Sequence, residues 1–184
     1  MGKISEPSPA AFIAGITYAD EDKIADVLEI LSDAFGAQEI KSPVFDFDMT
    51  DYYTREMGEN LKKFFYCFRD PIKLEMLPDI KLFTNETEIK FSSGSIGNLR
   101  RTVNIDPGYV NLSKLVLATT KDYSHRIFIG KGIYAETTLR FIKRTFVPLE
   151  TTYPDYKTPL AIHFFNTVRD FIKRNGNQWK LRKE

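Results

Sequence analysis

The stretch AAFIAGITYADEDKIADVLEILSDAFG, residues 10–36, decides the fold class. Its first ten residues are almost continuously apolar, which is typical of a strand that is buried on both faces and lies centrally in a sheet. The remainder repeats apolar side chains at helical spacing, between an aspartate that can cap a helix and Gly36, which can end one. A central strand followed directly by an amphipathic helix therefore opens the domain. The apolar positions of this helix are Ile24, Val27, Leu28, Leu31 and Phe35.

Outward from this unit, the hydrophobic pattern predicts the order β-α-β-β-α-β, followed by a hairpin and a C-terminal helix. This order predicts a single α+β domain over residues 1–184, with a mostly antiparallel sheet and helices mainly on one face. Residues 111–121 fit a short helix and a strand equally well, and we expect residues 1–9 and 177–184 to be flexible. The further elements are strands at 42–53, 61–71 (ended by Pro71) and 100–109 (ended by Pro107 and Gly108), helices at 78–92 and 158–175, and a hairpin at 122–141.

The composition is that of an ordinary soluble globular chain, with 42% hydrophobic and 28% charged residues. The 26 basic and 25 acidic residues nearly cancel, which counts against a nucleic-acid partner because no overall positive field exists. Cys67 is the only cysteine, so an intramolecular disulfide is excluded and a reducing cytoplasm is favoured. No apolar run is long enough for a signal peptide or a membrane span, so we expect no membrane partner.

The hairpin DYSHRIFIGKGIYAETTLRF, residues 122–141, gathers several polar groups. If the odd positions of both arms face the core, the tip at 130–132 sets a register in which Arg126 faces Glu136 and Phe128 faces Tyr134. An exposed ion pair of this kind contributes about 0.2–1 kcal/mol and needs no functional explanation. His125 is expected beside the pair on the core-side face, either as a structural residue or as a group that moves a proton near neutral pH.

Three aspartates permit a functional interpretation beside an ordinary one. Asp46 and Asp48 project from the same side of a predicted strand, about 7 Å apart, a spacing at which two carboxylates can share a divalent ion. The same alternation occurs on any solvated sheet. Asp106 precedes a Pro-Gly turn at a strand end, where both ligand-binding carboxylates and plain turn residues occur, and Asp155 in YPDY allows the same two interpretations.

The known nucleotide and nucleophile motifs are absent from the sequence. The glycine-containing segment SSGSIGNLRR, residues 92–101, lacks the Gly-Lys-Ser/Thr ending of a P-loop, so it is best explained as a flexible loop. There is also no Rossmann fingerprint and no G-x-S-x-G elbow, and the cysteine and two histidines have no zinc-site spacing.

Four segments of the chain resemble the prokaryotic family catalogued as domain of unknown function 4416, and the resemblance covers about residues 8 to 172. They are FDFDMTDYYTREMG, IKLFTNETE, VNIDPGYVNLSKLVLATTKDYSHRIFIGKGIYAETTLRF and YPDY. The resemblance implies no activity or substrate. It does imply that a polar set lies in family-like motifs, and this set is more polar than a core requires. Its members are Asp48, Thr50, Tyr52, Tyr53, Glu56, Asn85, Asp106, Tyr109, Lys121, Asp122, His125, Arg126, Glu136 and Asp155.

Our first hypothesis is a cytoplasmic enzyme or binding protein for a small anionic ligand, such as a phosphorylated compound or a nucleotide, together with a divalent cation, Mg²⁺ or Mn²⁺. It predicts that the candidate side chains converge in one cleft with perturbed pKa values. The candidate catalytic residues are His125, Asp106 and Glu136; the ligand-binding residues are Lys121, Arg126, Asp122, Tyr109, Asn85 and Asp155; the metal ligands are Asp48, Asp106 and Glu136.

Two hypotheses from other classes stay open at this point. The first is a non-catalytic protein-interaction module, for example a homodimer, anchored by exposed tyrosines. The second is RNA binding through local basic clusters, against which the near-zero net charge counts. The anchors of the first are Tyr52, Tyr53, Tyr134 and Tyr156; the basic residues of the second are Lys62, Lys63, Arg100, Arg101, Lys143 and Arg144.

Overall fold

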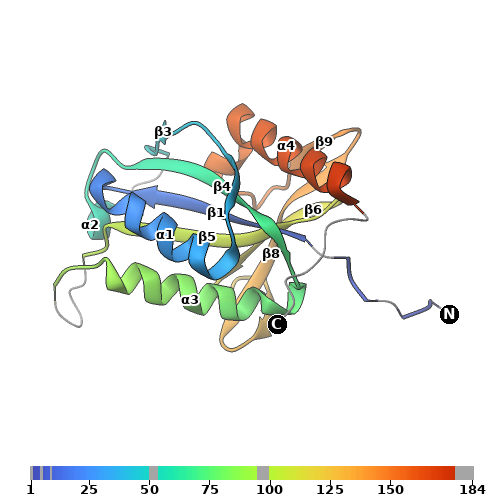
Figure 1. Ribbon diagram of the computed structural model, residues 1–184, viewed down its shortest axis with the longest axis horizontal. Coiled ribbons are helices and arrows are strands. Elements are labelled where there is room, and N and C mark those ends of the chain that lie inside the picture. Colours follow the sequence, from blue (N-terminus) through green and yellow to red (C-terminus); the bar gives the residue numbers. More distant parts are fainter. Residues whose placement is uncertain (1, 5, 9, 50–53, 95–99, 177–184) are drawn as a thin grey trace.

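The computed structural model describes residues 1–184 except 1, 5, 9, 50–53, 95–99 and 177–184. Within these ranges the chain forms one antiparallel sheet of nine strands, with helices on both of its faces (Figure 1). The α+β prediction is thus confirmed. The strands are β1 (Ala10–Tyr18), β2 (Gln38–Lys41), β3 (Phe45–Asp46), β4 (Lys62–Ile72), β5 (Val103–Val110), β6 (Lys114–Thr119), β7 (Ile127–Gly130), β8 (Ile133–Ile142) and β9 (Thr145–Pro148). The helices are α1 (Ile24–Phe35), α2 (Thr54–Met57), α3 (Leu77–Lys90) and α4 (Pro159–Asn175), with 3-10 turns η1 (Glu21–Lys23), η3 (Leu74–Met76) and η4 (Pro154–Lys157).

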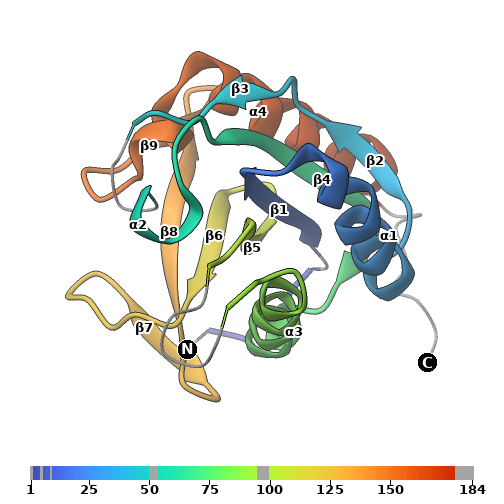
Figure 2. The same ribbon diagram turned by 90° about the vertical axis from the view of Figure 1, so that its left-hand side faces the viewer.

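The strand order is β2-β4-β1-β5-β6-β8-β7, with β3 beside β4 and β9 beside β8. Strand β1 is buried along its whole length because it lies between β4 and β5 and is covered on both faces. Its even-numbered residues pack into a core with α1 and α3, and Ala11 and Ile13 pack into a second core with α4. Two of the long helices therefore cover one face and α4 covers the other (Figure 2). No helix within the described ranges combines the length and the apolar character needed to cross a membrane.

Strand β5 differs from the prediction, and the difference creates an opening in the sheet. The strand does not end at Pro107 and Gly108 but continues to Val110. It pairs with β1 from Val103 to Val110, whereas β6 pairs with it only from Gly108 to Val110. Pro107 is tolerated because its missing N–H would point away from β1, toward the side that β6 has left. Among the described residues, no strand pairs with the first half of β5 on the side away from β1, so this part of β5 has a free edge.

A bulge in β8 explains why the predicted odd-numbered core face was wrong. Leu139 pairs with Leu115 and Thr137 pairs with Val116, so Thr138 is an extra residue in β8. The alternation inverts there: Ile133 belongs to the core with α1 and α3, and Leu139 belongs to the core with α4. The predicted pairing of Phe128 with Tyr134 is confirmed, and residues 114–119 form a strand.

Candidate functional site

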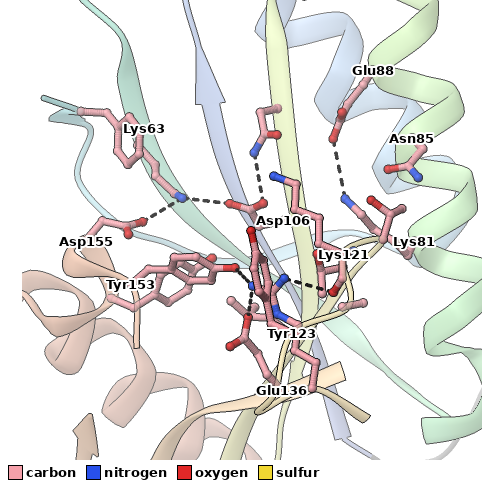
Figure 3. A pocket seen from close by; sticks show the side chains of 18 of the residues that line it. Lys63, Lys81, Asn85, Glu88, Asp106, Lys121, Tyr123, Glu136, Tyr153 and Asp155 are labelled. Atoms are coloured by element: carbon pink, nitrogen blue, oxygen red, sulfur yellow. Dashed lines mark hydrogen bonds and ion pairs between the residues drawn. The ribbon is translucent and has the colours of Figure 1, made fainter. Parts of the chain in front are cut away.

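A cavity of about 680 Å³ opens where β5 and β6 separate. Its walls come mainly from β4, β5, β6, β8, α3, the turn after β6, and η4 with the residue before it. Charged side chains of both signs line it in equal number, and Figure 3 shows several of them pointing toward one another. The basic ones are Lys63, Lys81, Arg101, Lys121 and Arg126, and the acidic ones are Glu56, Glu88, Asp106, Glu136 and Asp155.

A buried lysine between two aspartates forms one wall of the cavity. Lys63 Nζ lies 3.0 Å from Asp106 Oδ2 and 2.8 Å from Asp155 Oδ2, and its side chain is 3% exposed. Figure 3 shows Lys63 joined to both carboxylates. Gly15 on β1 makes this arrangement possible, because a Cβ there would lie 2.5 Å from Tyr156 Oη and 3.2 Å from Lys63 Cε.

The charges of this triad stabilise one another. Burial alone would lower the pKa of Lys63, but Asp155, Tyr156 and Asp106 outweigh it and raise that pKa above its ordinary value. Burial likewise acts to raise the pKa of Asp106, and Lys63 and Lys81 outweigh it, so that pKa is lowered. Asp106 is therefore ionised at neutral pH. Its side chain keeps 28% of its surface exposed and also accepts a hydrogen bond from Asn104 Nδ2 at 3.1 Å.

Side chains of α3 replace the hydrogen bonds that β6 does not make. Glu88 Oε1 accepts a hydrogen bond from the N–H of Ile105 at 2.8 Å, and Lys81 Nζ donates a hydrogen bond to the carbonyl of Ile105 at 3.1 Å. Glu88 also accepts from Arg101 at 2.9 Å, and Arg101 contacts Glu56 at 2.6 Å. Burial raises the pKa of Glu88, an effect that Lys81 and Arg101 partly offset. The N–H and the carbonyl of Ile105, on the free edge of β5, are thus satisfied without closing the cavity.

Glu136, on β8, is the centre of a third cluster that lines the cavity. Its Oε2 lies 2.8 Å from His125 Nε2, and its Oε1 accepts from Arg126 at 3.1 Å. Arg126 also donates to Tyr153 Oη and, at 3.1 Å, to the carbonyl of Lys121. Burial, followed by the charge of Glu136, raises the pKa of Tyr153. This cluster ties the turn after β6 to β8 and to the start of η4.

Two expectations about this cluster are corrected. The pair of Arg126 and Glu136 forms as predicted, but it is buried rather than exposed, with 4% and 3% of the two side chains accessible. His125 does not lie on the opposite face from the pair. Residues 123–126 form a turn closed by Arg126 N and Tyr123 O at 2.9 Å, so strand alternation does not apply and both side chains reach Glu136.

The structure brings together most of the predicted site residues. Asn85, Asp106, Lys121, Arg126, Glu136 and Asp155 line the cavity, and His125 joins them through Glu136. His125 itself and three other predicted residues are not part of the lining. Tyr109 is buried in the core with α1 and α3, whereas Asp48 and Asp122 are exposed.

The predicted metal ligands Asp48, Asp106 and Glu136 do not form a group, because Asp48 lies outside the cavity lining. Among the residues whose placement is described, no three His, Cys, Asp or Glu side chains are arranged to hold a metal ion. The donor set that Mg²⁺ or Mn²⁺ requires is therefore not found there, and we assign no metal ligand.

Sequence reasoning missed Lys63 and Tyr153 as parts of the site, and it placed Lys63 in an RNA-binding set. The sequence pattern contained the information: Lys63 lies on the same face of its strand as Phe65 and Cys67, which are buried, and a buried ammonium requires acidic partners. The interaction-module anchors also need correction. Tyr156 is buried, Tyr134 is partly exposed, and Tyr52 and Tyr53 lie outside the described residues.

The fold and site define an α+β protein whose antiparallel sheet separates around a polar, charge-paired cavity. A family model described as "Domain of unknown function (DUF4416)" matches residues 8–171, so the chain belongs to that family, as its motifs predicted. Comparisons with curated proteins and with solved structures found no match.

Proposed function

We propose that this protein binds a small anionic molecule that carries hydroxyl or other hydrogen-bond donors, in the cavity between β5 and β6. The observation that carries the proposal is the convergence of five basic and five acidic side chains around about 680 Å³. This volume lies within the usual range for small-molecule sites. Most of these charges are already held by partners, so the wall is preorganised and little ordering cost is left for the ligand.

Two side chains are suited to meet the ligand. Lys121 is exposed and lines the cavity from the turn after β6, where its ammonium can approach an anionic group. Asp106 is ionised and partly exposed, so it can accept hydrogen bonds from hydroxyl groups of the ligand. Lys63 and Asp155 hold Asp106 in place and act as positioning residues.

The cluster around Glu136 supports a further role if the protein acts on its ligand. Glu136 contacts Nε2 of His125 and thereby orients the imidazole, which leaves Nδ1 available to exchange a proton. Glu136 and Arg126 hold one another and are both buried, so they position His125 and the turn rather than contact a ligand directly. We place the protein in the cytoplasm, where Cys67, buried and with its pKa raised by burial, would stay reduced.

A thermal-shift screen tests the proposal. The purified chain is melted with sugar phosphates and nucleotides, each with and without Mg²⁺ or Mn²⁺. A compound at 100 times its dissociation constant adds about 2.7 kcal/mol, which raises the melting temperature by roughly 5–11 °C for a chain of this size. We expect the shift to be lost in Lys121→Ala and retained in Lys114→Ala, which changes a lysine at the other end of β6. Equal shifts in both variants, or none with any compound, would refute the proposal.

One observation favours homodimerisation as a second candidate function. Strand β7 ends the sheet, and its Ile127 and Phe128 are 73% and 59% exposed. An edge strand without charge or proline is open to pairing with a second copy of the same strand. Sedimentation velocity of the wild type and of Phe128→Lys tests this, with Ile142→Lys as the control at another exposed position. A monomer at all concentrations would exclude it.

A further inference from the structure

Tyr123 is an exposed aromatic residue at the rim of the cavity. It lies in the turn after β6, lines the cavity and keeps 57% of its surface accessible. One contact of its ring is with the guanidinium of Arg126, whose Cζ lies 4.6 Å from the ring centroid. The ring of His125 is nearly parallel to it, at 5° and with centroids 6.3 Å apart. Much of the tyrosine side chain therefore stays accessible beside the cavity.

The ring is supported by buried, bonded groups. The Arg126 side chain is only 4% exposed and is bound to Glu136, to Tyr153 and to the carbonyl of Lys121. The backbone N–H of Arg126 also closes the turn onto the carbonyl of Tyr123. A tyrosine fixed in this way contributes contact area at little conformational cost. Large aromatic surface held open at the mouth of a cavity is typical of a ligand contact.

We infer that Tyr123 is a stacking platform for a planar ring of the ligand, so that the anion bound in the cavity is a nucleotide or a similarly built heteroaromatic anion. This inference rests on the proposed function. Lys121, two residues earlier in the same turn, would meet the phosphate, and Asp106 would accept from sugar hydroxyls or ring N–H groups.

The contact with Arg126 favours a heteroaromatic ring over the face of a sugar. A cation over a tyrosine ring is attracted to its electron-rich face and draws on that electron density. The C–H groups of a sugar would contact the tyrosine ring through the same electron-rich face. A heteroaromatic ring instead stacks on it through contact area and an offset arrangement of the two ring quadrupoles. The arrangement of Arg126 under Tyr123 therefore points to base stacking.

Titration calorimetry with four nucleoside monophosphates, the four matching nucleosides, ribose 5-phosphate and inorganic phosphate tests the inference. Tyr123→Ala and Tyr123→Leu remove the aromatic ring, Tyr123→Phe keeps it, and melting curves check that each variant folds. Stacking on an aromatic side chain contributes a factor of roughly 5 to 150 in affinity. We expect at least one nucleotide to lose affinity by such a factor in the Ala and Leu variants but not in Phe, while binding of ribose 5-phosphate stays unchanged.

The outcomes separate the two proposals. If ribose 5-phosphate binds the wild type as tightly as every nucleotide, or if Tyr123→Ala leaves nucleotide affinity unchanged, the stacking inference is overturned while the anion site stands. If none of the probes binds the wild type, the proposed function fails and the inference fails with it. If nucleosides without phosphate bind as tightly as nucleotides and depend on Tyr123, the platform is supported and the anionic part of the proposed function is refuted.

Discussion

Replacing Lys63 with methionine tests the buried charge triad. The substitution keeps most of the side-chain volume but removes an ammonium that lies within 3.0 Å of both Asp106 and Asp155. Breaking a buried ion pair by removing one partner costs about 3–5 kcal/mol, because a charge is left buried without compensation. For a chain of this size the melting temperature should fall by roughly 6–20 °C. Lys62→Met is the matched control: Lys62 is adjacent in β4, and its pair with Asp46 is exposed, so we expect the melting temperature to change far less than in Lys63→Met.

The pH dependence of the Lys63→Met effect gives the sharper result. In the wild type, the pKa of Asp106 in the folded chain lies below its ordinary value. Its carboxylate therefore stabilises the fold fully when the pH is above that ordinary value. The contribution is lost as the pH falls through the folded-state pKa. Without Lys63, burial dominates and we expect the pKa of Asp106 to rise. The ionised carboxylate then opposes folding at neutral pH, and protonation relieves the penalty in acid.

Urea unfolding of the wild type and the variant, measured from pH 7 to about pH 4.5, checks this prediction. We expect the difference in unfolding free energy between the two proteins to shrink as the pH falls. A difference that stays constant over this range, or a variant as stable as the wild type at pH 7, would show that the triad does not carry the buried charges as described.

Two substitutions and a labelling experiment test other parts of the structure. Gly108→Ala should destabilise the chain by at least about 1–3 kcal/mol, since its Cβ would lie 2.3 Å from the carbonyl oxygen of Val116, and urea unfolding should show it. Gly15→Ala should cost less than Gly108→Ala, because it displaces the ends of two side chains rather than backbone; equal losses would contradict the geometry. Cys67 is buried and its pKa is raised, so a thiol reagent should label it only in urea, and rapid labelling of the native chain would refute its burial.

The sequence predicted the elements whose periodicity is local and missed the features that depend on neighbouring strands. The burial of β1 on both faces and the spacing of α1 follow from residues 10–36 alone, and both are present. The extent of β5 could not be predicted from the sequence. A proline ends a strand only where its nitrogen faces a neighbouring strand that needs a hydrogen bond, and the nitrogen of Pro107 faces the cavity. The bulge at Thr138 likewise depends on the pairing of β8 with β6.

The same distinction applies to the site. The pairing of Arg126 with Glu136 follows from hairpin register, which a sequence can specify through its turn. The burial of this pair does not follow from the register. Tyr153, which contacts Arg126, comes from a segment far away in the chain, and Tyr123 contacts Arg126 from a turn to which strand alternation does not apply. Lys63 was predictable as a buried charge in need of acids, but its partners Asp106 and Asp155 come from β5 and η4, whose proximity only the folded sheet establishes.

The opening between β5 and β6 is stabilised because side chains of α3 make the hydrogen bonds that a neighbouring strand would otherwise make. Where β6 leaves β5, the peptide groups of Ile105 would have to find water or a new partner, and Glu88 and Lys81 supply that partner from α3. Glu88 is in turn fixed by Arg101, so the N–H of Ile105 is satisfied by a group that is itself held. Asp106, the next residue, points to the opposite face of β5, toward Lys63, and keeps part of its surface open. The opening in the sheet is therefore a stable feature that displays an ionised carboxylate, which is the property a preorganised binding site requires.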